Sequence, residues 1–185
     1  MSPRIGSVVF ALTCVAQLAY PAGMIVGHEL VLRSGTPVRV RCEAVDPSDI
    51  LRGRYVRLRL EPFTIPVEKP QDYYGSPTVY ALLDTDAAGF ARLGGIRDRA
   101  PGSGLYVRAK VQSVNQETRE VTVGLPFDRY YMDEYDAPRA ENAYRSGVGK
   151  GDAFVVLRVR GGRAAIEDLF VGGRPIAELL SDQAR

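Results

Sequence analysis

An uncharged stretch near the N-terminus constrains this chain more than any other feature. Residues Ile5–Val26 run for 22 positions without a charged side chain. As an α-helix with about 1.5 Å rise per residue, the stretch would extend roughly 33 Å, enough to cross the hydrocarbon core of a bilayer. No second stretch of the sequence is apolar enough to do so, which excludes a multi-spanning membrane protein. The sequence therefore predicts one transmembrane helix, with residues 1–28 as the anchor and residues 5–26 in the lipid bilayer.

Three interpretations of this stretch compete. Its length favours an uncleaved anchor, because the apolar part of a signal peptide spans only about 7–15 residues. A cleaved signal peptide would use Cys14-Val15-Ala16, a poor small-x-small site. A buried core helix would need a polar face, which the stretch lacks. We expect a retained anchor with the N-terminus inside and the domain outside, because long C-terminal domains translocate largely regardless of flanking charges.

Residues 29–185 follow as one domain in which hydrophobicity alternates with a period of two. Val38 and Val40 share one face of a segment whose other face carries Arg39 and Arg41, and Tyr55–Glu61 alternates in the same way. Such alternation is typical of a strand with one buried and one solvated face. Further strands are expected at 78–83, 90–96, 105–114, 119–124, 153–160 and 164–169, and helical turns at 46–53, 138–145 and 175–182. The pattern predicts an all-β domain, either a sandwich or a partly open barrel with short helical turns.

Composition removes several classes of function. The net charge of +2 gives no indication of nucleic-acid binding, so no nucleic acid is expected as a partner. His28 is the only histidine, and Cys14 and Cys42 are the only cysteines, so neither a metal site nor a cofactor is expected. If Cys14 lies in lipid it cannot pair with Cys42, because a disulfide needs Cα atoms within about 7 Å.

The segment VDPSDILRGRYVRLRL, Val45–Leu60, resembles the GDYXXLXY-motif family of bacterial membrane-anchored proteins of unknown function. Gly53, Tyr55 and Leu58 match the motif, whereas Arg54 stands where the family has Asp and Leu60 where it has Tyr. Two later stretches, 125–134 and 161–176, are similar as well. The resemblance implies a single N-terminal anchor in the bacterial inner membrane and a β-rich domain on its periplasmic side. It also implies a multi-spanning membrane protein as partner, and it supplies no catalytic residue.

The first candidate site is the turn that contains the motif. Asp46, Asp49, Arg52 and Arg54 crowd around it, and Tyr55 follows directly. Arg52 could bind a carboxylate or phosphate with two parallel hydrogen bonds. The alternative is a capped turn in which Arg52 pairs with Asp49 or Asp46. We favour the capped turn, because the Asp-Pro pair and the glycine already have turn-forming roles.

The second candidate site is the segment Phe127–Glu134. Its candidate binding residues are Arg129, Tyr130, Tyr131 and Glu134. Tyrosine beside arginine is enriched at binding surfaces, but a tyrosine can equally pack its ring and use its hydroxyl inside the fold. Both interpretations stay open. The neighbouring tyrosines that could extend an aromatic edge are Tyr73, Tyr74, Tyr135 and Tyr144.

An enzyme remains the alternative. An anchored β-rich domain is also the layout of signal peptidase I, in which Ser34 would be the nucleophile and Lys69 or Lys110 the base. Such a lysine must lose its water, and Lys69 lies in an expected loop. The Ser-Met-x-Pro signature is also absent after the anchor. We therefore predict a non-catalytic binding domain outside the cytoplasmic membrane that works with a multi-spanning membrane protein.

Overall fold

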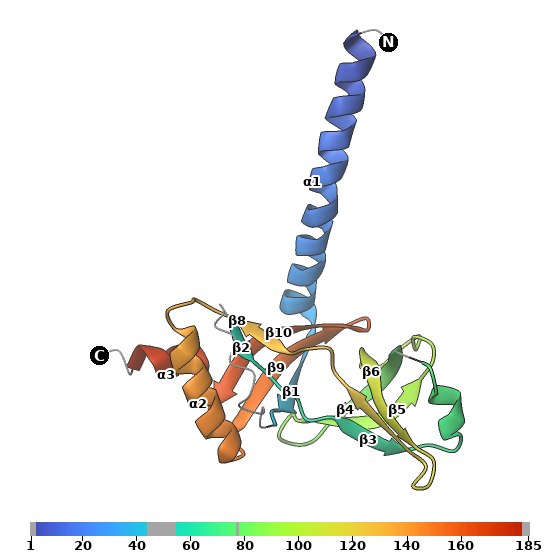
Figure 1. Ribbon diagram of the computed structural model, residues 1–185, viewed down its shortest axis with the longest axis vertical. Helices are drawn as coiled ribbons and strands as arrows, with labels where there is room; N and C mark the ends of the chain where they lie inside the picture. The colour runs from blue at the N-terminus through green and yellow to red at the C-terminus, as the bar shows by residue number, and fades with distance from the viewer. Residues whose placement is uncertain (1–2, 44–54, 77, 183–185) are drawn as a thin grey trace.

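The computed structural model describes residues 3–43, 55–76 and 78–182, and it begins with one long helix. Helix α1, Pro3–Ser34, projects away from a β-rich domain (Figure 1). It is long and apolar enough to cross a membrane, and its most apolar window is not covered by any part of the described chain. The helix continues past the uncharged stretch, because an ion pair of 2.6 Å joins Glu29 to Arg33 one turn later. Gly35 then ends it, with its N–H donating to the Val31 carbonyl.

Two main sheets and a two-stranded ribbon make up the domain. Strand order is β1-β9-β10-β11 in the first sheet, β3-β7-β6-β4-β5 in the second, and β2-β8 in the ribbon. Isolated bridges link them, so that the strands form a nearly closed, barrel-like arrangement. The all-β prediction is therefore confirmed. The strands are β1 (Thr36–Arg41), β2 (Tyr55–Arg57), β3 (Phe63–Pro66), β4 (Thr78–Thr85), β5 (Ala91–Arg97), β6 (Tyr106–Asn115), β7 (Glu120–Gly124), β8 (Arg129–Tyr131), β9 (Ala153–Arg160), β10 (Arg163–Val171) and β11 (Arg174–Pro175).

Alternation in the sequence becomes burial in the structure. Val38 and Val40 of β1 are buried, whereas Arg39 and Arg41 are exposed. Strand β9 lies between β1 and β10 and buries every second side chain from Ala153 onward. Because β1 pairs with β9, the first strand of the domain closes against one of the last, and the core is built from both ends of the chain.

One expected strand is shorter than predicted. We expected Tyr55–Glu61, but pairing as a strand stops at Arg57. Leu58 N–H still donates to the Asp128 carbonyl, just before β8, but the backbone then changes partners, and Glu61 N–H donates to the Arg41 carbonyl of β1. The alternation of burial nevertheless holds through this segment.

Three short helical elements accompany the sheets. Helix α2, Ala137–Gly149, begins with the proline expected there but runs beyond the predicted end at residue 145. Its buried residues recur at the spacing of one helical face, and they pack on the sheet. The other two are the short 3-10 helix η1, Pro70–Tyr73, and helix α3, Ile176–Asp182.

Candidate functional site

Tyr55 of the first candidate site and the segment Phe127–Glu134 lie far apart in the sequence but meet in the β2-β8 ribbon. Strand β2 carries the end of the motif segment, and β8 lies inside Phe127–Glu134. The antiparallel register sets Tyr55 opposite Tyr131. Since side chains alternate along a strand, Tyr55, Arg129 and Tyr131 share the outer face of the ribbon. We call these three residues the aromatic–arginine cluster.

The cluster is held by ring and cation contacts. The rings of Tyr55 and Tyr131 meet edge to face, with centroids 5.9 Å apart and planes at 64°. The Arg129 guanidinium carbon lies 5.0 Å from the centre of the Tyr55 ring, within range of a cation–π interaction. A hydrogen bond with Tyr131, and then the Asp128 carboxylate, raise the pKa of Arg129. Tyr131 is nonetheless 69% exposed, so the cluster presents an ordered apolar and cationic surface to solvent.

Tyr130 has a different role from its neighbours. Its side chain lies on the inner face of the ribbon, where its hydroxyl donates to Asp168 of β10 at 3.0 Å. Burial, and then the Asp168 carboxylate, raise the pKa of Tyr130 well above its usual range. Tyr130 thus ties the ribbon to the first sheet, as in the packed-tyrosine interpretation. The alternation of residues 129–131 is the sequence signal that separates it from Tyr131.

Four candidate residues, Asp46, Asp49, Arg52 and Arg54, lie outside the described residues. Hydrogen bonds join the chain on either side of this segment. Glu43 N–H donates to the Arg59 carbonyl at 2.7 Å. The Tyr144 hydroxyl donates to the Glu43 carbonyl at 3.2 Å and accepts from Arg59 N–H at 3.3 Å.

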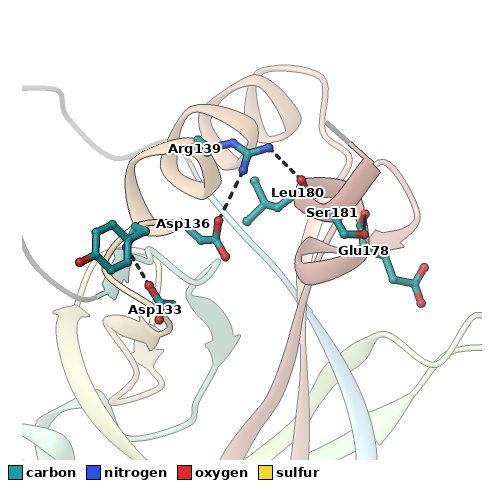
Figure 2. Close-up of polar contacts among 7 residues, drawn as sticks. Asp133, Asp136, Arg139, Glu178, Leu180 and Ser181 are labelled. Atoms are coloured by element: carbon teal, nitrogen blue, oxygen red, sulfur yellow. Dashed lines mark hydrogen bonds and ion pairs between the residues drawn. The ribbon is translucent and has the colours of Figure 1, made fainter. Parts of the chain in front are cut away.

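The connection from β8 into α2 continues the exposed surface. Glu134 and Tyr135 are exposed in the turn, and Tyr135 reaches 83% exposure. Figure 2 shows the polar contacts there, including Asp133, whose carboxylate accepts from Tyr135 N–H at 2.9 Å. In the same view Arg139 of α2 reaches α3, where it donates to the Leu180 carbonyl at 2.8 Å. The Asp133 carboxylate therefore holds the turn at one end, and the bond from Arg139 to the Leu180 carbonyl holds the helix that follows it.

The other tyrosines divide between surface and core. Tyr144 is only 1% exposed on the buried face of α2, so our expectation that it extends an aromatic edge is wrong. Tyr73 packs against the core, and Tyr74 is 54% exposed beside η1. Figure 1 shows η1 on the side of the domain away from the ribbon, so neither adjoins the cluster.

The residues of the enzyme alternative are engaged elsewhere. The Ser34 hydroxyl donates to the Leu30 carbonyl at 2.5 Å and accepts from Arg160 at 2.9 Å. Lys69 precedes η1, and Lys110 lies within β6, opposite Thr78 of β4. In the described part of the chain, no hydrogen bond joins Ser34 to either lysine. Nor do three His, Cys, Asp or Glu side chains among the described residues gather as metal ligands would.

The sequence was compared with models of known protein families, and one of them matches. The model of the GDYXXLXY protein family matches residues 17–169, from the middle of α1 into β10. Neither a curated protein nor a solved structure matches the chain. The match covers most of the sequence, including the segment with Gly53, Tyr55 and Leu58. This chain therefore belongs to the GDYXXLXY protein family, whose function is unknown.

Proposed function

We propose that α1 anchors this protein in the bacterial inner membrane and that residues 29–185 form a periplasmic binding domain. In this proposal, the aromatic–arginine cluster binds a multi-spanning membrane protein. The observation that carries it is the position of the cluster. Figure 1 shows β2 and β8 at the end of the domain from which α1 emerges. A surface at that end lies within reach of a neighbour in the same bilayer.

The exposed side chains of α1 support the anchor. Large apolar residues point outward along the helix, and nothing in the described chain covers them. Soluble monomers rarely expose an apolar surface of this size. The most exposed of these residues are Phe10, Leu18, Tyr20 and Ile25.

The junction between helix and domain supports a fixed orientation. Val31 is buried, and β1 starts at Thr36, directly after Gly35. A Cβ on Gly35 would lie 2.9 Å from the Arg158 Cβ of β9, so the helix end and the sheet are in close contact. Arg158 in turn holds Glu167 with two bonds of 2.7 and 2.8 Å and donates to the Gly35 carbonyl at 3.3 Å. Such a junction keeps the cluster at one height above the bilayer.

The chemistry of the cluster suits a protein partner. Tyrosine and arginine are the residues that most often dominate binding energy at interfaces. Here the contacts with Arg129 and Tyr55 already order Tyr131, so less entropy is lost when a partner binds.

Affinity capture from solubilised membranes tests the proposal. Full-length wild type should co-purify a multi-spanning membrane protein, identified by mass spectrometry. Tyr131→Ala should reduce the recovered partner by about tenfold or more, since an interface hot spot contributes about 2 kcal/mol. Tyr74→Ala removes another exposed tyrosine, from beside η1, and should leave recovery unchanged. Equal recovery with both variants would refute the role of the cluster.

A further inference from the structure

A cleft of about 590 Å³ lies where α1 meets the domain. One wall is the last part of α1, including Met24 and His28. The opposite wall comes from the β9-β10 hairpin with Arg163, from Arg108 of β6, and from Phe127 just before β8. The cleft thus combines apolar and cationic side chains from three distant parts of the sequence.

The two arginines of the cleft have no acidic partner among the described residues. Neither Arg108 nor Arg163 forms an ion pair with a carboxylate of the described residues. Glu29, which follows His28 of the cleft wall, pairs with Arg33, and Glu167 of β10 pairs with Arg158. The guanidinium of Arg108 lies only over the Tyr80 ring, 5.9 Å from its centre.

The hairpin brings further positive charge to the same place. Arg160 and Arg163 face each other across the Gly161-Gly162 turn. Like charges directly opposite each other destabilise a strand pair, and Arg160 donates to the Ser34 hydroxyl at 2.9 Å. The backbone fixes the arrangement: Arg108 N–H donates to the Gly162 carbonyl at 3.0 Å, and a Cβ at Gly162 would lie 2.8 Å from the Tyr106 ring. These contacts hold the backbone of Arg108 next to the hairpin that carries Arg163, and both arginines line the cleft.

The height of the cleft matches the headgroup layer of a bilayer. The uncharged stretch ends at Val26, and Arg163 Nη1 lies 3.1 Å from the Cβ position of Gly27. Each headgroup layer is about 5–7 Å thick, which corresponds to roughly 3–5 helical residues. Lipid phosphates would therefore lie beside residues 27–31, where the cleft opens.

We propose that this cleft binds the phosphate of an anionic phospholipid, with Arg108 and Arg163 as its ligands and Met24 beside the acyl chains. The inference rests on the proposed anchoring by α1. Guanidinium groups suit a phosphate because their donors can form two parallel bonds to it. A lipid fits better than free phosphate, because the cleft is open beside the apolar part of the helix and has the apolar side chains of Met24 and Phe127 in its walls.

A fluorescence titration of the full-length chain in dodecyl maltoside tests this. The protein has no tryptophan, so Phe127→Trp gives a single reporter inside the cleft. We expect a saturable response to phosphatidylglycerol and one at least about tenfold weaker to phosphatidylcholine with the same acyl chains. Adding Arg108→Gln and Arg163→Gln should weaken the phosphatidylglycerol midpoint by about tenfold or more.

The control variant carries Lys69→Gln and Arg119→Asn, which remove the same charge elsewhere. Val67 N–H donates to the Arg119 carbonyl, so these two positions are close together, and the β6-β7 turn points away from α1 in Figure 1. Asn tolerates the positive φ of 55° at position 119. This control should keep the wild-type midpoint. Replacing Arg108 and Arg163 with Lys is a milder variant, expected to weaken binding less, and it replaces the Gln pair if that variant misfolds.

Three results would overturn the inference. They are equal responses to the two lipids, a midpoint that neither arginine variant shifts, or saturation by inorganic phosphate at the same concentrations as phosphatidylglycerol. The last result would assign the cleft to a soluble phosphate. The proposed function fails differently: the chain would leave the membrane in an alkaline carbonate wash, or no partner would be captured. Both are measured without the titration.

Discussion

Tyr144→Phe removes a single hydroxyl group that links Glu43 to Arg59. The hydroxyl donates to the Glu43 carbonyl and accepts from Arg59 N–H, at 3.2 and 3.3 Å. The ring itself is 1% exposed, so water cannot easily replace both bonds. Burial raises the pKa of Tyr144 well above its usual range, so the hydroxyl stays protonated and can donate at any ordinary pH.

The expected magnitude follows from these two bonds. An intramolecular hydrogen bond contributes about 0.5–1.5 kcal/mol net, and long bonds fall toward the lower end. Tyr144→Phe should therefore cost about 1–2 kcal/mol. In a chain of this size each kcal/mol lowers Tm by roughly 2–4 °C, so the expected drop is about 2–8 °C. Tyr144→Ala also leaves a cavity and should cost about 3–5 kcal/mol.

Thermal unfolding of the full-length chain in detergent, followed by circular dichroism, measures both effects. Tyr74→Phe is the matched control, because its side chain is exposed, and its Tm should equal that of the wild type. If Tyr144→Phe unfolds within about 1 °C of the wild type while Tyr144→Ala is strongly destabilised, the ring matters and the two bonds do not. That result would refute the reasoning.

Two further predictions concern a thiol and a glycine. Burial raises the pKa of the Cys42 thiol from 9.0 to about 12, so at pH 8 the folded chain holds about 1000-fold less thiolate there. In a Cys14→Ser background, iodoacetamide should label Cys42 at least about tenfold more slowly in the folded than in the denatured chain, measured by mass spectrometry, and equal rates would contradict this burial. Gly35→Ala places a Cβ 2.9 Å from backbone and side-chain atoms of β9 and should lower Tm by about 2–12 °C, because overpacking costs about 1–3 kcal/mol. Gly102→Ala, where a Cβ meets nothing within 4 Å, should not change Tm, and equal Tm values for the two variants would contradict the tight junction.

The sequence predicted the parts of the fold that depend on neighbouring residues. Alternation of Val38 and Val40 with Arg39 and Arg41 predicted which side chains of β1 are buried, because the period of a strand is visible locally. The apolar stretch predicted α1 for a similar reason. Its continuation to Ser34 was missed, because it depends on the Glu29–Arg33 pair and on packing of Val31 against the domain.

The candidate site depends on pairing that a single sequence does not reveal. Nothing near Tyr55 indicates that Tyr131 lies opposite it, and register between distant strands is a tertiary property. The burial of Tyr144 could have been predicted from the sequence. Its spacing is that of one helical face, shared with Ala137, Ala140 and Gly147. The cleft could not be predicted from the sequence, because the pairing of distant strands brings Arg108 and Arg163 to the same cleft.

Photo-crosslinking in intact cells tests the central claim most directly. A benzoylphenylalanine residue at position 131 of the full-length chain would place a reactive group in the aromatic–arginine cluster, and one at position 74 would place it beside η1. We predict a crosslinked product from position 131 that contains a multi-spanning membrane protein, and none from position 74. No product from position 131, or one that contains only soluble proteins, would contradict the account.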